Sequence, residues 1–327
     1  MKLTKLGIRG LVSTIIPVHN RGEMLREAVQ SVLNQTWRPV EIIIVDDGST
    51  DDTPHVAEAL AAQHPDIIRV LHQRNAGPGL ARQAGLEAAR GEFVQFLDSD
   101  DLLMPDKFGL QVQGLLNDPE AGISYGLTLA RDESTGTSVP THGTEQIHRD
   151  IFPAVLKARL WHTITPLYRR SVCEAIGPWA DLRLLEDWDY DCRAGLLGIK
   201  LHYCPEALAV HRYHGGEHAG LAWQRDLKAM RDRASAVERV FGYARQADVS
   251  IDSEEMQHFA RVTFRLSRQC GAAGLGAESR RLFNLARQAS GENRNDGLDF
   301  RMYEIAAALM GWTAIGRLSD WLDKARR

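Results

Sequence analysis

Short apolar runs alternate with amphipathic stretches over the first part of the chain. β-type runs occupy residues 12–18, 40–45, 67–71 and 93–97, and between them apolar residues recur at the three- and four-residue spacing of a helix. Strands that alternate with helices in this way form βαβ units. The pattern predicts an α/β fold whose mainly parallel sheet is covered by helices on both faces.

The middle of the chain is less regular. Residues 124–130, 163–168 and 207–213 have the composition of strands, and residues 186–197 have the spacing of a helix. Residues 131–143 are polar and rich in turn formers, which predicts a mobile hairpin or loop.

A helical texture begins after His218. Proline is absent from there to the end of the chain, and apolar residues keep a helical period. We therefore expect an α/β domain in residues 1–218 and an all-helical extension in residues 219–327. Near the end of the extension, one helical face collects several large apolar residues, namely Trp312, Ile315, Leu318, Trp321 and Leu322. Such a face favours a buried core or an oligomer contact, and the alternative is a helix that lies in a membrane interface.

Composition excludes several classes of protein. The formal net charge of −4 over 327 residues gives no basic field that could hold nucleic acid. The four cysteines are scattered without a CxxC pair, which suits a reducing compartment. The first apolar run is interrupted at Pro17, and no stretch approaches the roughly 20 apolar residues of a membrane span. We expect a cytoplasmic protein, either soluble or peripheral on the inner membrane face.

Each of the four apolar runs leads into a polar loop. Ligands of parallel α/β sheets bind beyond the carboxyl ends of the strands, so these loops are the place to look for chemistry. They contain Pro17-Val18-His19-Asn20, Asp46-Asp47-Gly48-Ser49, Asn75-Ala76-Gly77-Pro78-Gly79 followed by Arg82, and Asp98-Ser99-Asp100-Asp101.

The acidic loop after the fourth run predicts a cation site. Asp98, Asp100 and Asp101 repel one another at the rim of a buried strand, and a divalent cation would relieve that repulsion. Mg²⁺ and Mn²⁺ prefer carboxylate oxygen, and Mg²⁺ often binds one or two carboxylates together with substrate phosphates. The alternative is a solvated acidic loop in front of a helix that opens near Pro105.

Five segments, taken together and in order, resemble family 2 glycosyltransferases with a GT-A (Rossmann-like) fold. They are IIPVHNR, VDDGSTDDT, NAGPGLARQAG, GEFVQFLDSDDLLMPDKF and EDWDYDCR, and the resemblance spans residues 12 to about 214. It implies a nucleotide-sugar-binding and catalytic domain in residues 1–218. The helical extension would then make contacts with the acceptor, with another subunit or with a membrane.

The resemblance implies roles for the first loops. Pro17, His19 and Asn20 would cradle the nucleotide base, and Asp47 would contact the uracil edge. Carboxylates accept hydrogen bonds from imide donors, which fits this role. The alternative for the Asp46-Asp47 pair is a turn that leads into the next helix, and for Asp46 the two readings weigh equally.

The resemblance also implies how the diphosphate is held. Asp98 matches the residue that binds the ribose, and Asp100 matches the ligand of a bound Mn²⁺ or Mg²⁺. Asn75 and Arg82 belong to the NxGxxxAR pattern near the nucleotide. His214 would approach the metal or diphosphate from the far side, and the neighbouring Arg212 would steady phosphate charge.

Glu186 and Asp187 resemble the ED motif of this family. Asp187 is the candidate general base for the acceptor hydroxyl, and Glu186 would orient the acceptor or its neighbour. On a helix Asp187 and Asp191 share a face while Asp189 points elsewhere, so Asp191 is the second choice for the base. The alternative is a cluster of acids that favours a helix N-terminus.

The leading hypothesis is therefore an inverting, metal-dependent transferase that uses a nucleotide-sugar, by expectation a UDP-sugar. The acceptor would be a glycan, a lipid-linked molecule or a small molecule, and it would meet the loop near residues 131–143. The alternative is a non-catalytic nucleotide-sugar-binding scaffold of the same fold. A sugar-nucleotide pyrophosphorylase would need a glycine-rich loop with a basic residue after the first strand, and Pro17-Val18-His19-Asn20 is not such a loop.

Overall fold

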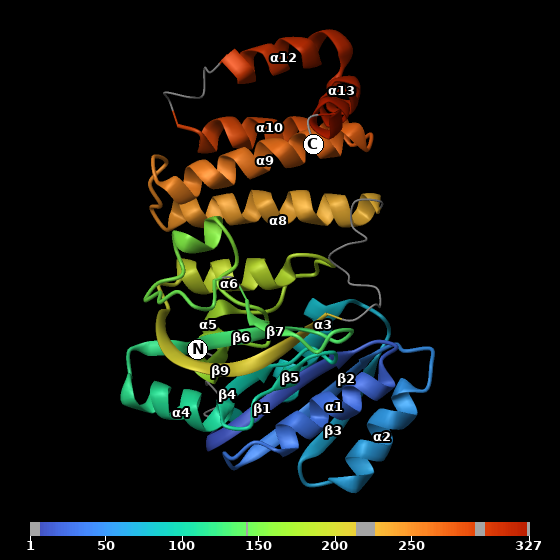
Figure 1. Ribbon diagram of the computed structural model, residues 1–327, viewed down its shortest axis with the longest axis vertical. Helices are drawn as coiled ribbons and strands as arrows, with labels where there is room; N and C mark the ends of the chain where they lie inside the picture. The colour runs from blue at the N-terminus through green and yellow to red at the C-terminus, as the bar shows by residue number, and fades with distance from the viewer. Residues whose placement is uncertain (1–6, 142, 214–225, 292–297, 326–327) are drawn as a thin grey trace. The chain divides into compact units, whose positions relative to one another are not determined.

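The computed structural model describes residues 7–141, 143–213, 226–291 and 298–325 (Figure 1). The chain divides into two compact units. The first contains residues 1–151 and 159–216, and the second contains residues 152–158 and 217–327. Residues 152–158 thus belong with the helical part, which the sequence pattern did not indicate. The functional roles expected for residues 1–218 and 219–327 stay predictions.

A mixed sheet forms the centre of the first unit. In the described residues it has nine strands in the order β3-β2-β1-β4-β8-β6-β9-β5, with β7 paired to β6. β1 to β4 are parallel to one another, β8 is antiparallel to β4 and β6, and β9 runs parallel to β6. The strands are β1 (Ile8–Val18), β2 (Val40–Asp47), β3 (Ile68–Gln73), β4 (Gly91–Phe96), β5 (Leu102–Leu103), β6 (Ala121–Asp132), β7 (Ser138–Pro140), β8 (Leu167–Arg169) and β9 (Lys200–Tyr213).

Helices cover both faces of the parallel part of the sheet, as predicted. Ile16 and Ile44 belong to the apolar cluster that α1 and α2 close on one face. On the other face α3 packs so closely that a Cβ at Gly85 would lie 2.3 Å from the Ile15 side chain. The helices of this unit are α1 (Gly22–Leu33), α2 (Thr53–Gln63), α3 (Pro78–Ala88), α4 (Lys107–Asn117), α5 (Arg170–Ile176) and α6 (Glu186–Leu196).

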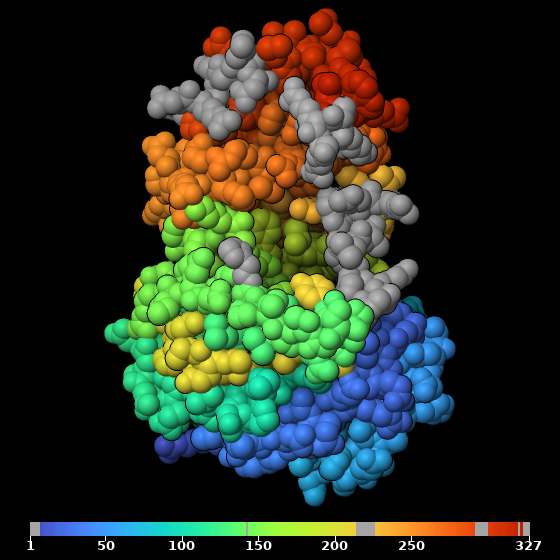
Figure 2. All heavy atoms as spheres, in the orientation of Figure 1, coloured from blue at the N-terminus to red at the C-terminus, as the bar shows by residue number. Residues whose placement is uncertain are grey.

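The second half of the sheet differs in detail from the sequence expectation. The expected strand at residues 163–168 is reduced to β8, because Pro166 has no N–H to donate to a ladder. β9 is longer than expected, and β6 extends to Asp132 and pairs with β7, so residues 131–143 contain a hairpin. Figure 2 shows β6, β7 and β9 side by side on the surface.

The second unit is helical in its described residues. It contains the short helix η1 (Ala154–Leu156) and the helices α8 (Leu227–Gln246), α9 (Glu254–Ala272), α10 (Gly276–Ala289), α12 (Leu298–Met310) and α13 (Trp312–Ala325). The predicted apolar face of α13 is only partly covered: Ile315 is buried, whereas Leu318, Trp321 and Leu322 are exposed. Among the residues described, no helix has the length and apolarity to cross a bilayer.

Candidate active site

The loops after β1, β2 and β3 are joined by hydrogen bonds at the carboxyl edge of the sheet. His19 Nδ1 lies 3.1 Å from the carbonyl oxygen of Asp47 and 3.3 Å from Asn75 Nδ2. Asn20 has a left-handed backbone (φ 53°), and its side-chain oxygen accepts the Thr50 N–H at 2.7 Å. The structure thus brings together three of the loops that the sequence analysis singled out. His19, Asn20 and Asn75 are exposed there, and Pro17 is buried at the end of β1.

Asp47 is buried and organises the third loop. Its carboxylate accepts hydrogen bonds from Gln73 Nε2 at 2.7 Å and from the N–H groups of Ala76 and Gly77 at 2.8 Å each. Asp46 accepts the Ser49 N–H at 3.1 Å, as its turn reading predicts. Contact of Asp47 with a uracil ring stays a prediction.

Arg82 links the acidic loop to the ED motif. From α3 its Nη1 donates to Glu186 Oε1 at 2.7 Å, and its Nη2 donates to Asp98 Oδ1 at 2.6 Å. The guanidinium also lies 5.0 Å from the centre of the Trp179 ring. The Arg82 side chain is 4% exposed, so its charge is balanced by these carboxylates rather than by water.

The approach of α3 to this region needs a small residue. A Cβ at Gly79 would lie 2.7 Å from the Ala180 carbonyl oxygen and 3.3 Å from Glu186 Cγ. Gly79 therefore lets the first turn of α3 pack directly against the start of α6.

The remaining acids of the DSDD loop have different partners. Asp100 forms an ion pair with Arg21 from the loop after β1. Asp101 is buried and accepts the Arg212 N–H at 2.9 Å, with His211 Nδ1 at 3.1 Å. Burial raises the pKa of Asp101 to about 6 against the opposing effect of His211.

Arg212 holds the acidic loop. Its Nε donates to the Asp100 carbonyl oxygen at 2.5 Å, and its guanidinium pairs with Glu27 of α1. These contacts give Arg212 a structural role. Its expected interaction with the phosphate charge of a donor stays a prediction.

The donor set of the acidic loop fits a divalent cation. Asp98 and Asp100 offer hard carboxylate oxygens, and their side chains are 31% and 16% exposed, so both can reach a ligand. Each carboxylate already has a positively charged neighbour, because Arg21 pairs with Asp100 and Arg82 pairs with Asp98. Within the described ranges, three or more Asp, Glu, His or Cys side chains do not converge on one point. His214 lies outside the described residues.

The ED motif begins α6 after a backbone outlier. Leu185 has a left-handed conformation (φ 62°, ψ 18°), which is unusual for a branched residue and directly precedes Glu186. Strained backbone of this kind is often found at functional sites.

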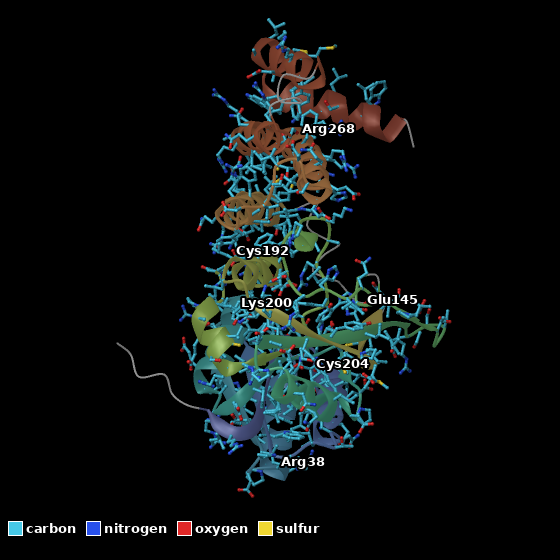
Figure 3. All side chains as sticks on the ribbon, turned by 90° about the vertical axis from the view of Figure 1, so that its left-hand side faces the viewer. Arg38, Glu145, Cys192, Lys200, Cys204 and Arg268 are labelled. Carbon is cyan, nitrogen blue, oxygen red and sulfur yellow. The ribbon has the colours of Figure 1, made fainter. Side chains whose placement is uncertain are left out.

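The four cysteines are free thiols and are buried. Cys192 lies on the buried side of α6, and both Cys192 and Cys204 are labelled in Figure 3.

Asp187 and Asp191 bind one guanidinium, which confirms that they share a helix face. Arg159 Nη1 donates to Asp187 Oδ2 at 2.5 Å, and its Nε and Nη2 lie 3.2 and 3.0 Å from Asp191 Oδ2. Thr163 Oγ1 donates to Asp187 Oδ2 at 3.2 Å, and Trp161 Nε1 donates to Asp191 Oδ1 at 3.1 Å. Arg159 and Trp161 carry no sequence signal for this role, because an irregular loop has no periodicity that would mark its partners, and Thr163 was expected only as the first residue of a strand.

The acids of this helix differ in their pKa. Burial raises the pKa of Glu186, and the adjacent Asp187 charge adds to that effect despite Arg82. Burial also raises the pKa of Asp191, to about 6. For Asp187 burial acts in the same direction, but the charges of Arg159 and Arg82 outweigh it and lower the pKa. Of Glu186, Asp187 and Asp191, Asp187 is therefore the acid that is most readily ionised.

A surface hollow of about 500 Å³ lies beside the loop that was expected to meet the acceptor. Residues of α1, β5, β6 and β9 line it, together with Glu133 directly after the end of β6; Arg131 is the residue that β6 contributes. The acceptor itself stays a prediction.

Comparison with known proteins identifies the family. The model of glycosyl transferase family 2 matches residues 13–176, which is half of the chain, and the chain belongs to this family. An uncharacterized glycosyltransferase of Nostoc sp. is 35% identical over 217 residues, which cover 62% of this chain and 65% of that relative. A protein of Bacillus subtilis named putative glycosyltransferase EpsH is 32% identical over 216 residues, which cover 62% of this chain and 61% of that relative. The chain thus matches less than two thirds of the length of these relatives.

Solved structures confirm the GT-A fold. A crystal structure of TarS from Staphylococcus aureus in complex with UDP-GlcNAc has a TM-score of 0.70 at 20% identity, covering 96% of this chain and 92% of that one. The mannosyltransferase PcManGT from Pyrobaculum calidifontis, in complex with GDP-Man and Mn²⁺, has a TM-score of 0.53 at 18% identity, covering 94% and 87%. At these identities the similarity concerns the fold.

Proposed function

We propose that this protein is an inverting, metal-dependent glycosyltransferase that moves a sugar from a UDP-sugar to an acceptor hydroxyl. The observation that carries the proposal is the Arg82 guanidinium, which joins Asp98 of the acidic loop to Glu186 of the ED motif. Two motifs far apart in the chain therefore face one place, where a donor and an acceptor could meet. Membership of family 2 gives the same class of activity.

The donor would lie along the loops at the carboxyl edge of the sheet. Pro17, His19, Asn20, Asp47 and Asn75 would surround the base, with Asp98 beside the ribose and Arg82 behind it. Asp100 would hold Mn²⁺ or Mg²⁺, with His214 as a further ligand. When bound, the ion would offset the negative charge that develops on the departing diphosphate.

The transfer itself needs a proton acceptor for the attacking hydroxyl. The Asp187 carboxylate would take that proton while the acceptor oxygen bonds to the anomeric carbon and the bond to the diphosphate oxygen breaks. A single displacement inverts the anomeric centre and requires no nucleophilic side chain. Glu186 would orient the acceptor or hold Arg82, and Asp191 is the second candidate for the base.

A uridine donor is favoured over a guanosine donor. The TarS structure, with a TM-score of 0.70, holds UDP-GlcNAc, whereas the mannosyltransferase structure, with a TM-score of 0.53, holds GDP-Man. A thermal-shift screen of nucleotide-sugars with and without Mn²⁺ tests this choice. Stabilisation by UDP-sugars would support the proposal. Stabilisation by GDP-sugars alone would mean that the donor is a GDP-sugar and not a UDP-sugar.

A non-catalytic scaffold of the same fold is the second candidate. It would bind the nucleotide-sugar but release no nucleotide from it. The test makes two measurements on wild type and on Asp187→Asn. Nucleotide release reports turnover, and calorimetry reports binding of the donor. If the substitution abolishes release and spares binding, the protein is an enzyme; if wild type releases nothing while binding the donor, it is the scaffold.

The acceptor and the cellular position belong to the proposal as well. A glycan, lipid-linked or small-molecule acceptor is consistent with the open surface beside Arg131 and Glu133. The helical extension would provide acceptor, oligomer or membrane contacts through the exposed Leu318, Trp321 and Leu322. A cytoplasmic protein, either soluble or peripheral on the inner membrane face, fits these features.

A further inference from the structure

Segment 159–163 supplies partners to both acids on one face of α6. Arg159 reaches Asp187 and Asp191, Trp161 reaches Asp191, and Thr163 reaches Asp187. Alternate residues of one short segment thus bind the proposed base and the acid one turn behind it. A loop that only filled space would not need to direct three polar side chains at two neighbouring carboxylates.

We propose that Arg159 is a positioning residue that aims the Asp187 carboxylate, and that Asp191 anchors Arg159 for this task. The inference rests on the proposed function, because it takes Asp187 as the base. It changes the role of Asp191 from a second candidate base to the support of the first.

The geometry of the guanidinium supports this division of labour. Nε and Nη2 both point at Asp191 Oδ2, so two donors fix one edge of the planar group. Nη1 at the other end is then aimed at Asp187 Oδ2. Asp191 is itself held by Trp161, so the chain of contacts ends in a buried aromatic side chain. A lysine could supply the charge at this position but not the fixed fork.

The contacts of Asp187 also indicate which oxygen accepts the proton. Oδ2 receives hydrogen bonds from Arg159 and Thr163, which together use both of its lone pairs. Oδ1 receives one hydrogen bond, from the Trp188 N–H at 2.7 Å. Among the described contacts Oδ1 therefore keeps a lone pair, and we assign it as the atom that takes the proton of the acceptor hydroxyl.

Several charges act on Asp187 and set the direction of a pH test. Arg159 and Arg82 favour its ionised form, whereas burial and the neighbouring acids oppose it. The titratable and charged groups that face it come from α3, α6, the loop before β8 and β8 itself. They are Arg82, Glu186, Asp191, Arg159, His162 and Tyr168. Removal of the Arg159 charge should raise the pKa of Asp187, whereas removal of the Asp191 charge should not.

The experiment compares the pH dependence of kcat and kcat/KM for UDP release from UDP-GlcNAc, with water as the acceptor, in the full chain with Mn²⁺. For Arg159→Gln we expect kcat to fall about 100-fold. The acidic limb of the pH profile, over which activity rises as Asp187 ionises, should move about one pH unit to higher pH. For Arg159→Lys the limb should stay in place while kcat falls about tenfold. For Asp191→Asn kcat should fall about tenfold, with no upward move of the limb and an unchanged affinity for UDP.

Asp189→Asn is the matched control. Asp189 is buried on the same helix and pairs with Arg193 at 2.9 Å, but on another face. It should leave both kcat and the acidic limb as in wild type. An acidic limb that does not move in Arg159→Gln, or that moves equally in Arg159→Lys, overturns the positioning role.

Failure of the positioning role and failure of the proposed function give different results. If wild type transfers sugar and Asp187→Asn does not, but the Arg159 variants keep the wild-type profile, the positioning inference is wrong and the proposed function stands. If Arg159→Gln fails to fold, Asp191→Asn decides, because wild-type kcat in that variant contradicts the anchor. If wild type transfers nothing, the proposed function and the inference built on it are both wrong.

Discussion

Arg82 and Glu186 form a 2.7 Å ion pair across 104 positions of the sequence, and the side chains are only 4% and 8% exposed. The same guanidinium binds Asp98, so one cation connects the two acidic motifs. Buried charges are costly unless each is paired. This triad therefore fixes the distance between the acidic loop and the start of α6, and a donor and a base can work at one site.

Arg82→Met should destabilise the protein by about 3 kcal/mol, because it leaves two carboxylates without their partner. Urea unfolding followed by circular dichroism measures the change. Arg26→Met is the matched control, since Arg26 forms an exposed pair with Glu23 on α1 and should change the unfolding free energy by less than about 0.5 kcal/mol. Equal effects of the two substitutions would show that the triad does not hold the fold.

Glu186→Gln should gain stability relative to wild type as pH rises, although at every pH it lacks the charged pair with Arg82. Because burial raises the pKa of Glu186 in the folded state, its contribution to stability is fully present below its unfolded pKa. That contribution is lost as pH rises through the folded pKa, whereas the variant has no group that titrates there. We expect the melting temperature of the variant minus that of wild type to increase by about 2 °C or more between pH 4 and pH 8. A difference that decreases over this range would contradict the pKa direction.

Arg21→Ala should bind Mn²⁺ more tightly than wild type in the absence of nucleotide. Arg21 pairs with Asp100, so the guanidinium and the metal compete for one carboxylate. A partly exposed pair is worth about 1 kcal/mol, which corresponds to about fivefold in the dissociation constant. Mn²⁺ titration followed by electron paramagnetic resonance measures it, with Arg26→Ala as the control. Unchanged or weaker binding would mean that Asp100 does not hold the metal.

The exposed apolar side chains of α13 give a test of membrane contact. If the protein sits on a membrane surface, the triple substitution of Leu318, Trp321 and Leu322 to serine should reduce flotation with anionic liposomes at least about fivefold. Nucleotide release in solution should not change. Wild type that does not float with the liposomes ends the membrane hypothesis and leaves an oligomer contact, which light scattering measures.

The sequence predicted the elements whose signals are local. The four strand runs and the helix that begins at Glu186 are present because apolar periodicity and helix starts are set by neighbouring residues. The shared face of Asp187 and Asp191 followed from helical geometry alone. The match of the ordered motifs to a family was also readable, because short motifs in a fixed order are improbable by chance.

The partners of those residues could not be predicted. Arg82 was placed beside the nucleotide, but its contact with Glu186 depends on how α3 packs against α6. Arg159 lies in an irregular segment, and an arginine in a loop carries no sign of which acid it will meet. The strand expected at residues 163–168 is shortened to β8 because Pro166 cannot donate a hydrogen bond. The strand-like composition of the neighbouring residues outweighed that proline in the prediction.

The most direct measurement of the central claim is paired calorimetry and nucleotide release for wild type, Asp187→Asn and Asp100→Asn with a UDP-sugar and Mn²⁺. We predict that Asp187→Asn binds the donor within about twofold of wild type but loses at least about 10³-fold in turnover. Asp100→Asn should lose metal-dependent donor binding. Wild-type turnover in Asp187→Asn, or metal-dependent donor binding that survives in Asp100→Asn, would contradict the account.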